Sequence, residues 1–304
     1  MRKIIVAVDE SEGSHDAIRL ASRVGGITGA QLMFVNVFPY DQHPSRAVNT
    51  AFEHYLRQDS EELLERLRST HGDDNVEVRA VANTSSAGGL QQVAEREDAA
   101  LIVVGSTHTG RAGRVLPGST AERLLHGAPC PVAVAPKGHA QHAGELAAVG
   151  CGFDGSMSAQ RALAAAAAIA GATGARLRVL RAFKPVSATV PMKGVPFGGM
   201  AAHNDELRDH AAKELEAAVT RLGVEGAEAQ LTIGDAETVL ADASESLDLL
   251  LLGSRGYGPM HAVVVGGVAG RLVREAACPV MVFPRTAAHT AEDSLFAHAA
   301  TVTD

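Results

Sequence analysis

Residues 101–120 read LIVVGSTHTGRAGRVLPGST, an apolar run followed by a glycine-containing segment. The same arrangement returns at residues 249–268 as LLLLGSRGYGPMHAVVVGGV. Runs of Val, Ile and Leu that do not alternate with polar residues are typical of strands covered on both faces. Each glycine-containing segment ends where a helix is expected to begin. The two stretches therefore predict strand–loop–helix units of an α/β fold.

The chain contains one unit written twice. Residues 3–21, KIIVAVDESEGSHDAIRLA, are similar to residues 148–166, AVGCGFDGSMSAQRALAAA. The segment APCPVAVAP at 128–136 is likewise similar to AACPVMVFP at 276–284. The matching segments keep their order and nearly constant separation, so we interpret the chain as a duplicated domain of about 145 residues rather than a short solenoid repeat.

Each copy is expected to contain parallel strands separated by helices. The strands are predicted near 3–8, 31–37, 76–82, 100–104 and 131–135, and near 147–152, 176–182, 228–233, 248–252 and 279–283. This alternation predicts a doubly wound sheet, so the expected fold class is α/β, with two five-stranded, parallel-sheet, Rossmann-like domains in tandem. We expect domains at 1–138 and 146–285 and a tail at 286–304 that is disordered or forms a loosely docked helix.

Composition argues against several classes of function. The 304-residue chain has a net charge of −8, no Trp and only 3 Tyr, so we expect no nucleic-acid binding. No apolar stretch reaches the ~20 residues of a membrane span, and the start MRKIIVAVDE reads as a strand rather than a signal peptide. The 3 Cys form no CxxC pair, which favours a cytoplasmic location. The 13 His show no HExxH spacing, so no zinc site is expected.

The glycine-containing segments leave the carboxyl ends of predicted strands, where open parallel sheets bind ligands. They lead into helix N-termini, whose free N–H groups suit phosphate. Residues 105–112, GSTHTGRA, are not a P-loop, because Arg111 and Ala112 stand where Lys and Ser/Thr are needed. The glycines can therefore be plain turns or a phosphate cradle. Asp9 and Asp154, which follow the first strand of each copy, can likewise be turn acids or ligand contacts.

In combination, these motifs resemble the universal stress protein family. The resemblance rests on Gly253, Gly256 and Gly266, which match the G-x2-G-x9-G part of its nucleotide motif, on VAVDESE with Asp9, and on the closing CPVAVAP strand. It covers residues 1–136 and 146–284. It implies a HUP-type fold with an adenine-nucleotide site in each copy.

The resemblance also implies roles for particular residues. Asp9 and Asp154 would contact the nucleoside, the backbone at Val37 and Ala182 would hold the adenine, and Gly234 would add a backbone contact. The phosphates would lie on Gly105, Gly118 and Ser119 in the first copy and on Gly253, Gly256 and Gly266 in the second. His108 replaces the second glycine of the first copy, and Gly267 replaces the Ser/Thr of the second. We expect the second copy to be the better site.

The resemblance implies a stress-response protein that binds ATP, with Mg²⁺ as a possible companion, and acts as a nucleotide-dependent regulator. The alternatives are a scaffold that has lost nucleotide and acts through protein contacts, and a weak ATP hydrolase. No catalytic residue is selected by the sequence, so an enzyme is not expected. The resemblance further suggests that strands 131–135 and 279–283 pair antiparallel across a pseudo-twofold axis. It also makes a homodimer possible.

Overall fold

The computed structural model describes residues 2–40, 50–73, 75–106, 119–141, 144–186, 200–254, 267–285 and Leu295. The first half contains β1 (Lys3–Ala7), α1 (Glu12–Thr28), β2 (Gln31–Phe38), α2 (Thr50–His71), β3 (Glu77–Ala82), α3 (Ser86–Arg96), β4 (Leu101–Gly105), α4 (Ser119–Gly127) and β5 (Val132–Ala135). All the strand pairs within this half are parallel. The predicted alternation of strands and helices is confirmed.

A short 3-10 helix, η1 (His139–Gln141), leads into the second half. That half contains β6 (Ala148–Gly152), α5 (Met157–Thr173), β7 (Arg176–Phe183), α6 (Met200–Leu222), β8 (Glu228–Ile233), α7 (Ala236–Ser244), β9 (Leu249–Gly253), α8 (Gly267–Glu275) and β10 (Val280–Phe283). Its strands are also parallel to one another. The two halves repeat the same order of elements, which confirms the duplication.

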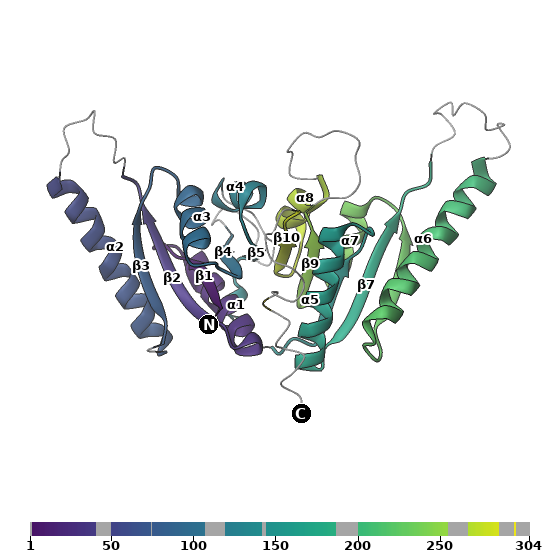
Figure 1. The fold of residues 1–304 in the computed structure, drawn as a ribbon, viewed down its shortest axis with the longest axis horizontal. Helices are drawn as coiled ribbons and strands as arrows, with labels where there is room; N and C mark the ends of the chain where they lie inside the picture. The colour runs from purple at the N-terminus through teal and green to yellow at the C-terminus, as the bar shows by residue number, and fades with distance from the viewer. Residues whose placement is uncertain are drawn as a thin grey trace.

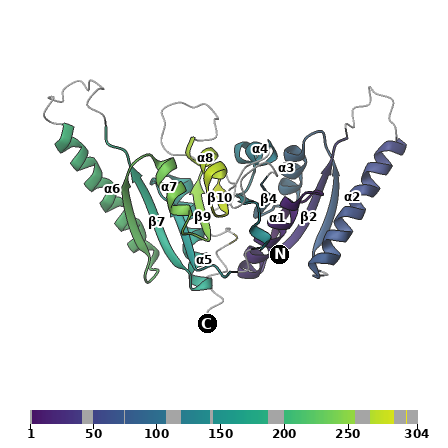
Figure 2. The same ribbon diagram turned by 180° about the vertical axis from the view of Figure 1, so that it is seen from behind.

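The two half-sheets join into one ten-stranded sheet with the order β3-β2-β1-β4-β5-β10-β9-β6-β7-β8. The junction is the antiparallel pair β5–β10, in which Val134 lies opposite Val280 and Val132 opposite Val282. Figure 1 shows this pair at the centre, with α2 and α6 at the two outer ends. The reverse view in Figure 2 shows the same arrangement. The predicted pairing of the two copies is confirmed.

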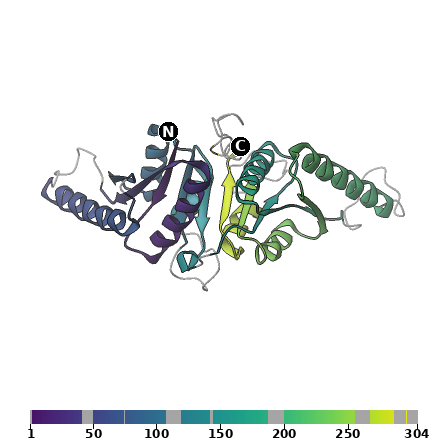
Figure 3. The same cartoon turned by 90° about the horizontal axis from the view of Figure 1, so that it is seen from below.

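Helices cover both faces of the sheet and create two buried clusters. One cluster gathers side chains from α1, α2, α5 and α6, and the other gathers side chains from α3, α4, α7 and α8. Neighbouring residues of one strand enter different clusters, as Ile4 and Ile5 of β1 do. This explains why the strands read as continuous apolar runs. The view from below in Figure 3 shows the two half-sheets side by side along β5 and β10.

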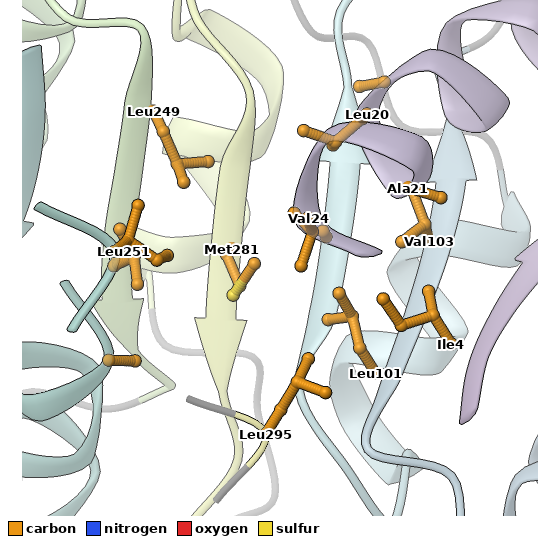
Figure 4. Close-up of a cluster of buried hydrophobic side chains, with 14 of the residues drawn as sticks. Ile4, Leu20, Ala21, Val24, Leu101, Val103, Leu249, Leu251, Met281 and Leu295 are labelled. Atoms are coloured by element: carbon orange, nitrogen blue, oxygen red, sulfur yellow. The ribbon is translucent and has the colours of Figure 1, made fainter. Parts of the chain in front are cut away.

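The connection between the halves is held against α1. Asp16 is 3% exposed, and its carboxylate accepts hydrogen bonds from the backbone N–H groups of Gly138 (2.9 Å) and Ala140 (2.7 Å). A second tie crosses the junction on the other face of the sheet, where Arg274 of α8 pairs with Glu122 of α4. Of the tail expected at 286–304, the structure describes only Leu295, which is 4% exposed within a core cluster (Figure 4). This residue is therefore part of the folded core.

Candidate functional site

The carboxyl ends of β1, β2 and β4 open into a cavity of about 190 Å³. The first turns of α1, α3 and α4 complete its walls. Among the residues lining it are Asp9, Val37 and Gly105, three of the residues that the sequence proposed for the first copy. The fold therefore brings these three together at the edge where parallel sheets bind ligands.

Asp9 and Asp154 both organise a turn. Asp9 Oδ1 accepts hydrogen bonds from the backbone N–H of Ser11 (2.9 Å) and from the Ser14 hydroxyl (3.0 Å). Asp154 Oδ1 accepts from the backbone N–H of Ser156 (2.9 Å). These bonds use one carboxylate oxygen of each Asp, and no hydrogen bond among the described residues uses Oδ2 of either side chain. The turn role suggested by the sequence is therefore real, and it remains compatible with a ligand contact.

The first glycine of each predicted motif is required by packing. A Cβ on Gly105 would lie 2.1 Å from the carbonyl oxygen of Gly13, at the start of α1. A Cβ on Gly253 would lie 2.6 Å from the backbone nitrogen of Ala159 and 2.6 Å from the hydroxyl of Ser158, in α5. Both strands thus end against the N-terminus of a helix, so these two glycines have a structural reason that involves no ligand.

Ser106 is a site residue that the sequence reasoning missed. It lines the cavity and is 6% exposed, and its hydroxyl has no hydrogen-bond partner among the described residues. A buried hydroxyl without a partner costs about 1–3 kcal/mol, and a ligand in the cavity could satisfy it. The duplication carried the signal that could have found it, because Ser254 follows Gly253 as Ser106 follows Gly105.

The two halves differ beside this edge. In the first half Asn36, which lines the cavity, donates from Nδ2 to the carbonyl of Val8 (2.8 Å) and accepts from the Ser60 hydroxyl of α2 (2.7 Å). In the second half, Arg181 occupies the matching position of β7 and forms an ion pair with Glu214 of α6 (2.7 Å). The second half therefore places a cation where the first half has a neutral amide.

The other predicted site residues are not part of the lining of this first-half cavity, or they lie outside the described residues. Gly234 has a φ of 153°, and it lines a separate groove beside α7 that also includes Arg178 and Asp242. Ala182 lies in β7, where it pairs with Thr232 of β8. Ser119 and Gly267 are the first residues of α4 and α8. The remaining predicted residues, His108, Gly118, Gly256 and Gly266, lie outside the described residues.

The three thiols are not reactive centres. Cys130, Cys151 and Cys278 are buried and form no disulfide. Burial raises the pKa of both Cys130 and Cys278 to about 12. Burial also raises the pKa of Cys151. Thiols with such values stay protonated near neutral pH and are poor nucleophiles.

An ion-pair network lies at the opposite, amino edge of the first half. Lys3 on β1 pairs with Glu97 (2.7 Å) and Glu77 (2.9 Å), and Arg79 pairs with Glu97 (2.5 Å). The hydrogen bond from Lys3, followed by that from Arg79, holds the pKa of Glu97 below its usual range. The bond to Glu97 in turn raises the pKa of Lys3. This network ties strands together and is remote from the cavity.

Within the residues that the structure describes, no group of three or more His, Cys, Asp or Glu side chains is arranged to hold a metal ion. None of the helices in that part of the chain combines the length and the apolar character needed to cross a membrane.

Comparisons with known proteins agree with this architecture. The chain is 29% identical over 214 residues to a universal stress protein of Mycobacterium tuberculosis, covering 67% of this chain and 70% of the relative. It is 26% identical over 294 residues to a universal stress protein of Mycolicibacterium smegmatis, covering 92% and 96%. The crystal structure of a putative universal stress protein from Pseudomonas aeruginosa UCBPP-PA14 matches with a TM-score of 0.64 at 16% identity, over 99% of this chain and 97% of that one.

A universal stress protein structure from Archaeoglobus fulgidus matches with a TM-score of 0.64 at 20% identity, over 93% of this chain and 98% of that one. These structural matches establish the fold. The model of the universal stress protein family matches twice, at residues 1–136 and at residues 147–284. The chain therefore belongs to the universal stress protein family, as a member with two family domains in tandem.

Proposed function

We propose that this stress-response family member binds an adenine nucleotide at the carboxyl edges of its half-sheets and that nucleotide occupancy regulates its contacts with partners. The cavity at the ends of β1, β2 and β4 carries the proposal. It lies where doubly wound sheets bind ligands, and the first turns of α1, α3 and α4, whose N-terminal ends suit phosphate, form part of its walls. The residues that line it also fit a nucleotide chemically.

In the first half, different groups would contact the ribose, the adenine and the phosphates of the nucleotide. Oδ2 of Asp9, which has no hydrogen-bond partner among the described residues, would accept a hydrogen bond from a ribose hydroxyl. The backbone of Val37, at the end of β2, would read the adenine edge. The first turn of α4, which contributes Thr120 to the lining, would meet the phosphates. The Ser106 hydroxyl would gain the partner that it lacks among the described residues.

The second half repeats the same plan, with Asp154, Ala182, Gly253 and Gly267 at the matching edge. Its spacing of Gly253, Gly256 and Gly266 is the more complete glycine motif. We therefore propose that the second half is the tighter site and the first half the weaker one. ATP is the proposed ligand, because three phosphates offer the most charge to helix N-termini, and Mg²⁺ would accompany the phosphates.

The nucleotide content of the purified protein tests this proposal. Protein purified without added nucleotide is denatured in acid, and the supernatant is chromatographed for adenine nucleotides. We expect about one nucleotide per chain in the wild type, its loss in Gly256→His, and an increase in His108→Gly. If the wild type carries none and takes up none when ATP and Mg²⁺ are added, nucleotide binding is wrong.

One observation favours the scaffold alternative, in which the chain acts only through protein contacts. Packing alone already explains Gly105 and Gly253, so these glycines would remain in a chain that had lost its ligand. The same experiment separates the alternatives, because a scaffold would bind no nucleotide. Turnover of ATP that disappears in Asp154→Asn while binding is retained would instead support the weak hydrolase.

A further inference from the structure

An arginine on α4 lies beside the rim of the first-half cavity. Arg123 follows Thr120 by three residues, so the two side chains lie on the same face of the helix, and Thr120 lines the cavity. Arg123 Nη1 donates a hydrogen bond to the hydroxyl oxygen of Ser85, the N-cap residue of α3, at 3.3 Å. The next residue, Ser86, is itself part of the cavity lining. The guanidinium group therefore lies between α3 and α4, whose first turns form part of the cavity walls (Figure 1).

This guanidinium group keeps most of its hydrogen-bond donors unused within the described part of the chain. Arg123 is exposed, and its acceptor, the Ser85 hydroxyl, is neutral and also accepts from the backbone N–H of Gly88 at 3.4 Å. Among the residues that the structure describes, no carboxylate forms an ion pair with Arg123. The first turn of α3 contains no acidic residue. Because a guanidinium carries five N–H donors, Arg123 can bind an anion without losing a charged partner.

The second half replaces this contact with an ion pair. Arg271 of α8 matches Arg123, because AGRLV at 269–273 repeats AERLL at 121–125. Helices α7 and α8 pack together as α3 and α4 do. The first turn of α7, however, contains Glu237, whose carboxylate pairs with Arg271 at 2.5 Å. The cation of the second half is therefore already neutralised by the protein, whereas the cation of the first half contacts only a neutral hydroxyl among the described residues.

We propose that Arg123 contacts the phosphates of a nucleotide bound in the first half, and that Glu237 keeps the equivalent Arg271 from making this contact in the second half. The inference rests on the proposed nucleotide site and adds a phosphate-binding side chain to it. Phosphates at the first turn of α4 are close to Arg123, and a guanidinium binds a phosphate more strongly than it binds a neutral hydroxyl. An independent sign of a ligand in this cavity is Ser106, whose buried hydroxyl has no partner among the described residues.

Labelling of the full chain with a photoreactive ATP analogue tests the proposal, because mapping the labelled peptides reports the two halves separately. The matching adenosine analogue, which has no phosphates, is the comparison. We expect Arg123→Ala to weaken binding of the ATP analogue to the first half by about tenfold at low salt, and by less at high salt. Labelling by the adenosine analogue should stay unchanged, which also shows that the variant is folded. The matched control is Arg96→Ala, which removes an exposed arginine at the far end of α3 and should behave like the wild type.

The second half should show the opposite change. Glu237→Gln removes the carboxylate that pairs with Arg271, so we expect the ATP analogue to bind the second half about threefold to tenfold more tightly. Glu245→Gln, at the C-cap of α7, is the control and should have no effect. The inference is overturned if Arg123→Ala matches Arg96→Ala, if Arg123→Ala weakens both analogues equally, or if Glu237→Gln matches Glu245→Gln. If the wild type binds neither analogue, the proposed nucleotide site itself is wrong, and the inference fails with it.

Discussion

The two halves fasten the second strand to the long outer helix in different ways. The first half uses Asn36, which bridges the carbonyl of Val8 and the hydroxyl of Ser60. The second half uses the ion pair of Arg181 and Glu214, in which the Arg181 side chain is 16% exposed and the Glu214 side chain 40%. The contact between the second strand and the outer helix can therefore be made by neutral hydrogen bonds in one half and by an ion pair in the other. This requires that the buried polar groups find partners. Because Asn36 also lines the cavity, the choice changes the charge beside the candidate site as well.

The largest expected effect on stability comes from substituting the first glycine of each motif, Gly105 or Gly253. Gly105→Ala would place a Cβ 2.1 Å from a backbone carbonyl, whereas Gly253→Ala would meet a backbone nitrogen and a hydroxyl at 2.6 Å. We expect both to lower the free energy of unfolding, by about 3 kcal/mol or more for Gly105→Ala and by less for Gly253→Ala. Urea denaturation measures both.

The control for these glycines is Gly171→Ala in α5, where an added Cβ meets nothing within 4 Å. We expect it to be neutral or to stabilise the protein by about 0.5–1 kcal/mol, because alanine favours the helix. If Gly105→Ala proved as mild as Gly171→Ala, the close packing of β4 against α1 would be wrong.

Salt should change the stability contributed by the Arg181–Glu214 contact but not that contributed by the Asn36–Ser60 contact. Asn36→Ala removes hydrogen bonds from a Ser60 hydroxyl that is 3% exposed, so we expect a loss of about 2 kcal/mol at any ionic strength. Arg181→Ala breaks a partly exposed ion pair, so we expect a loss of about 1 kcal/mol that shrinks as salt is added. Denaturation at low and high salt measures both. If the stability losses of both variants changed equally with salt, the proposed difference between a neutral contact and an ion pair would be contradicted.

The amino edges of the two halves also differ in charge. Glu97 of the first half sits between Lys3 and Arg79, whereas the corresponding corner of the second half has Arg178 bonded to neutral Gln230 and Ser246. The pKa of Glu97 is lowered in the folded state, so its contribution to stability is present above the usual Glu value of about 4.3 and is lost as the pH falls through the folded pKa.

We therefore expect Glu97→Gln to cost under about 1 kcal/mol near neutral pH, and we expect this difference from the wild type to shrink below about pH 4. Free energies of unfolding measured across this pH range provide the test. Glu228→Gln, at the exposed start of β8, is the control and should leave the profile unchanged. If the difference in the free energy of unfolding between Glu97→Gln and the wild type grew as the pH fell, the lowered pKa of Glu97 would be contradicted.

The smallest effect on stability is expected at Ser106. Because its hydroxyl has no partner among the described residues, Ser106→Ala should leave the Tm of the nucleotide-free protein unchanged or slightly raised. It should weaken ATP binding to the first half by about tenfold or less. A clear loss of stability without nucleotide would mean that the hydroxyl already has a partner in the protein.

The sequence was sufficient for the fold and for part of the lining of the candidate cavity. Apolar runs such as LIVV and LLLL, with the repeated order of segments, predicted the two half-sheets, and the family resemblance implied their antiparallel junction. Asp9, Val37 and Gly105 met as expected, because strand ends in a doubly wound sheet converge on one edge. Ser106 was missed although the repeat of Gly105–Ser106 at Gly253–Ser254 pointed to it, because the burial of its hydroxyl depends on the folded cavity. The position of Leu295 was missed because its burial depends on the assembled seam and not on local pattern.

The most direct test of the central claim is a calorimetric titration of the nucleotide-free protein with ATP and Mg²⁺, with GTP as the comparison. We predict one tight and one weaker site for ATP, with Gly256→His removing the tight site and Ser106→Ala affecting only the weaker one. GTP should bind much more weakly, since the backbone at Val37 and Ala182 is proposed to read the adenine edge. The absence of any ATP binding, or equal affinity for ATP and GTP, would contradict the assignment of an adenine-nucleotide site.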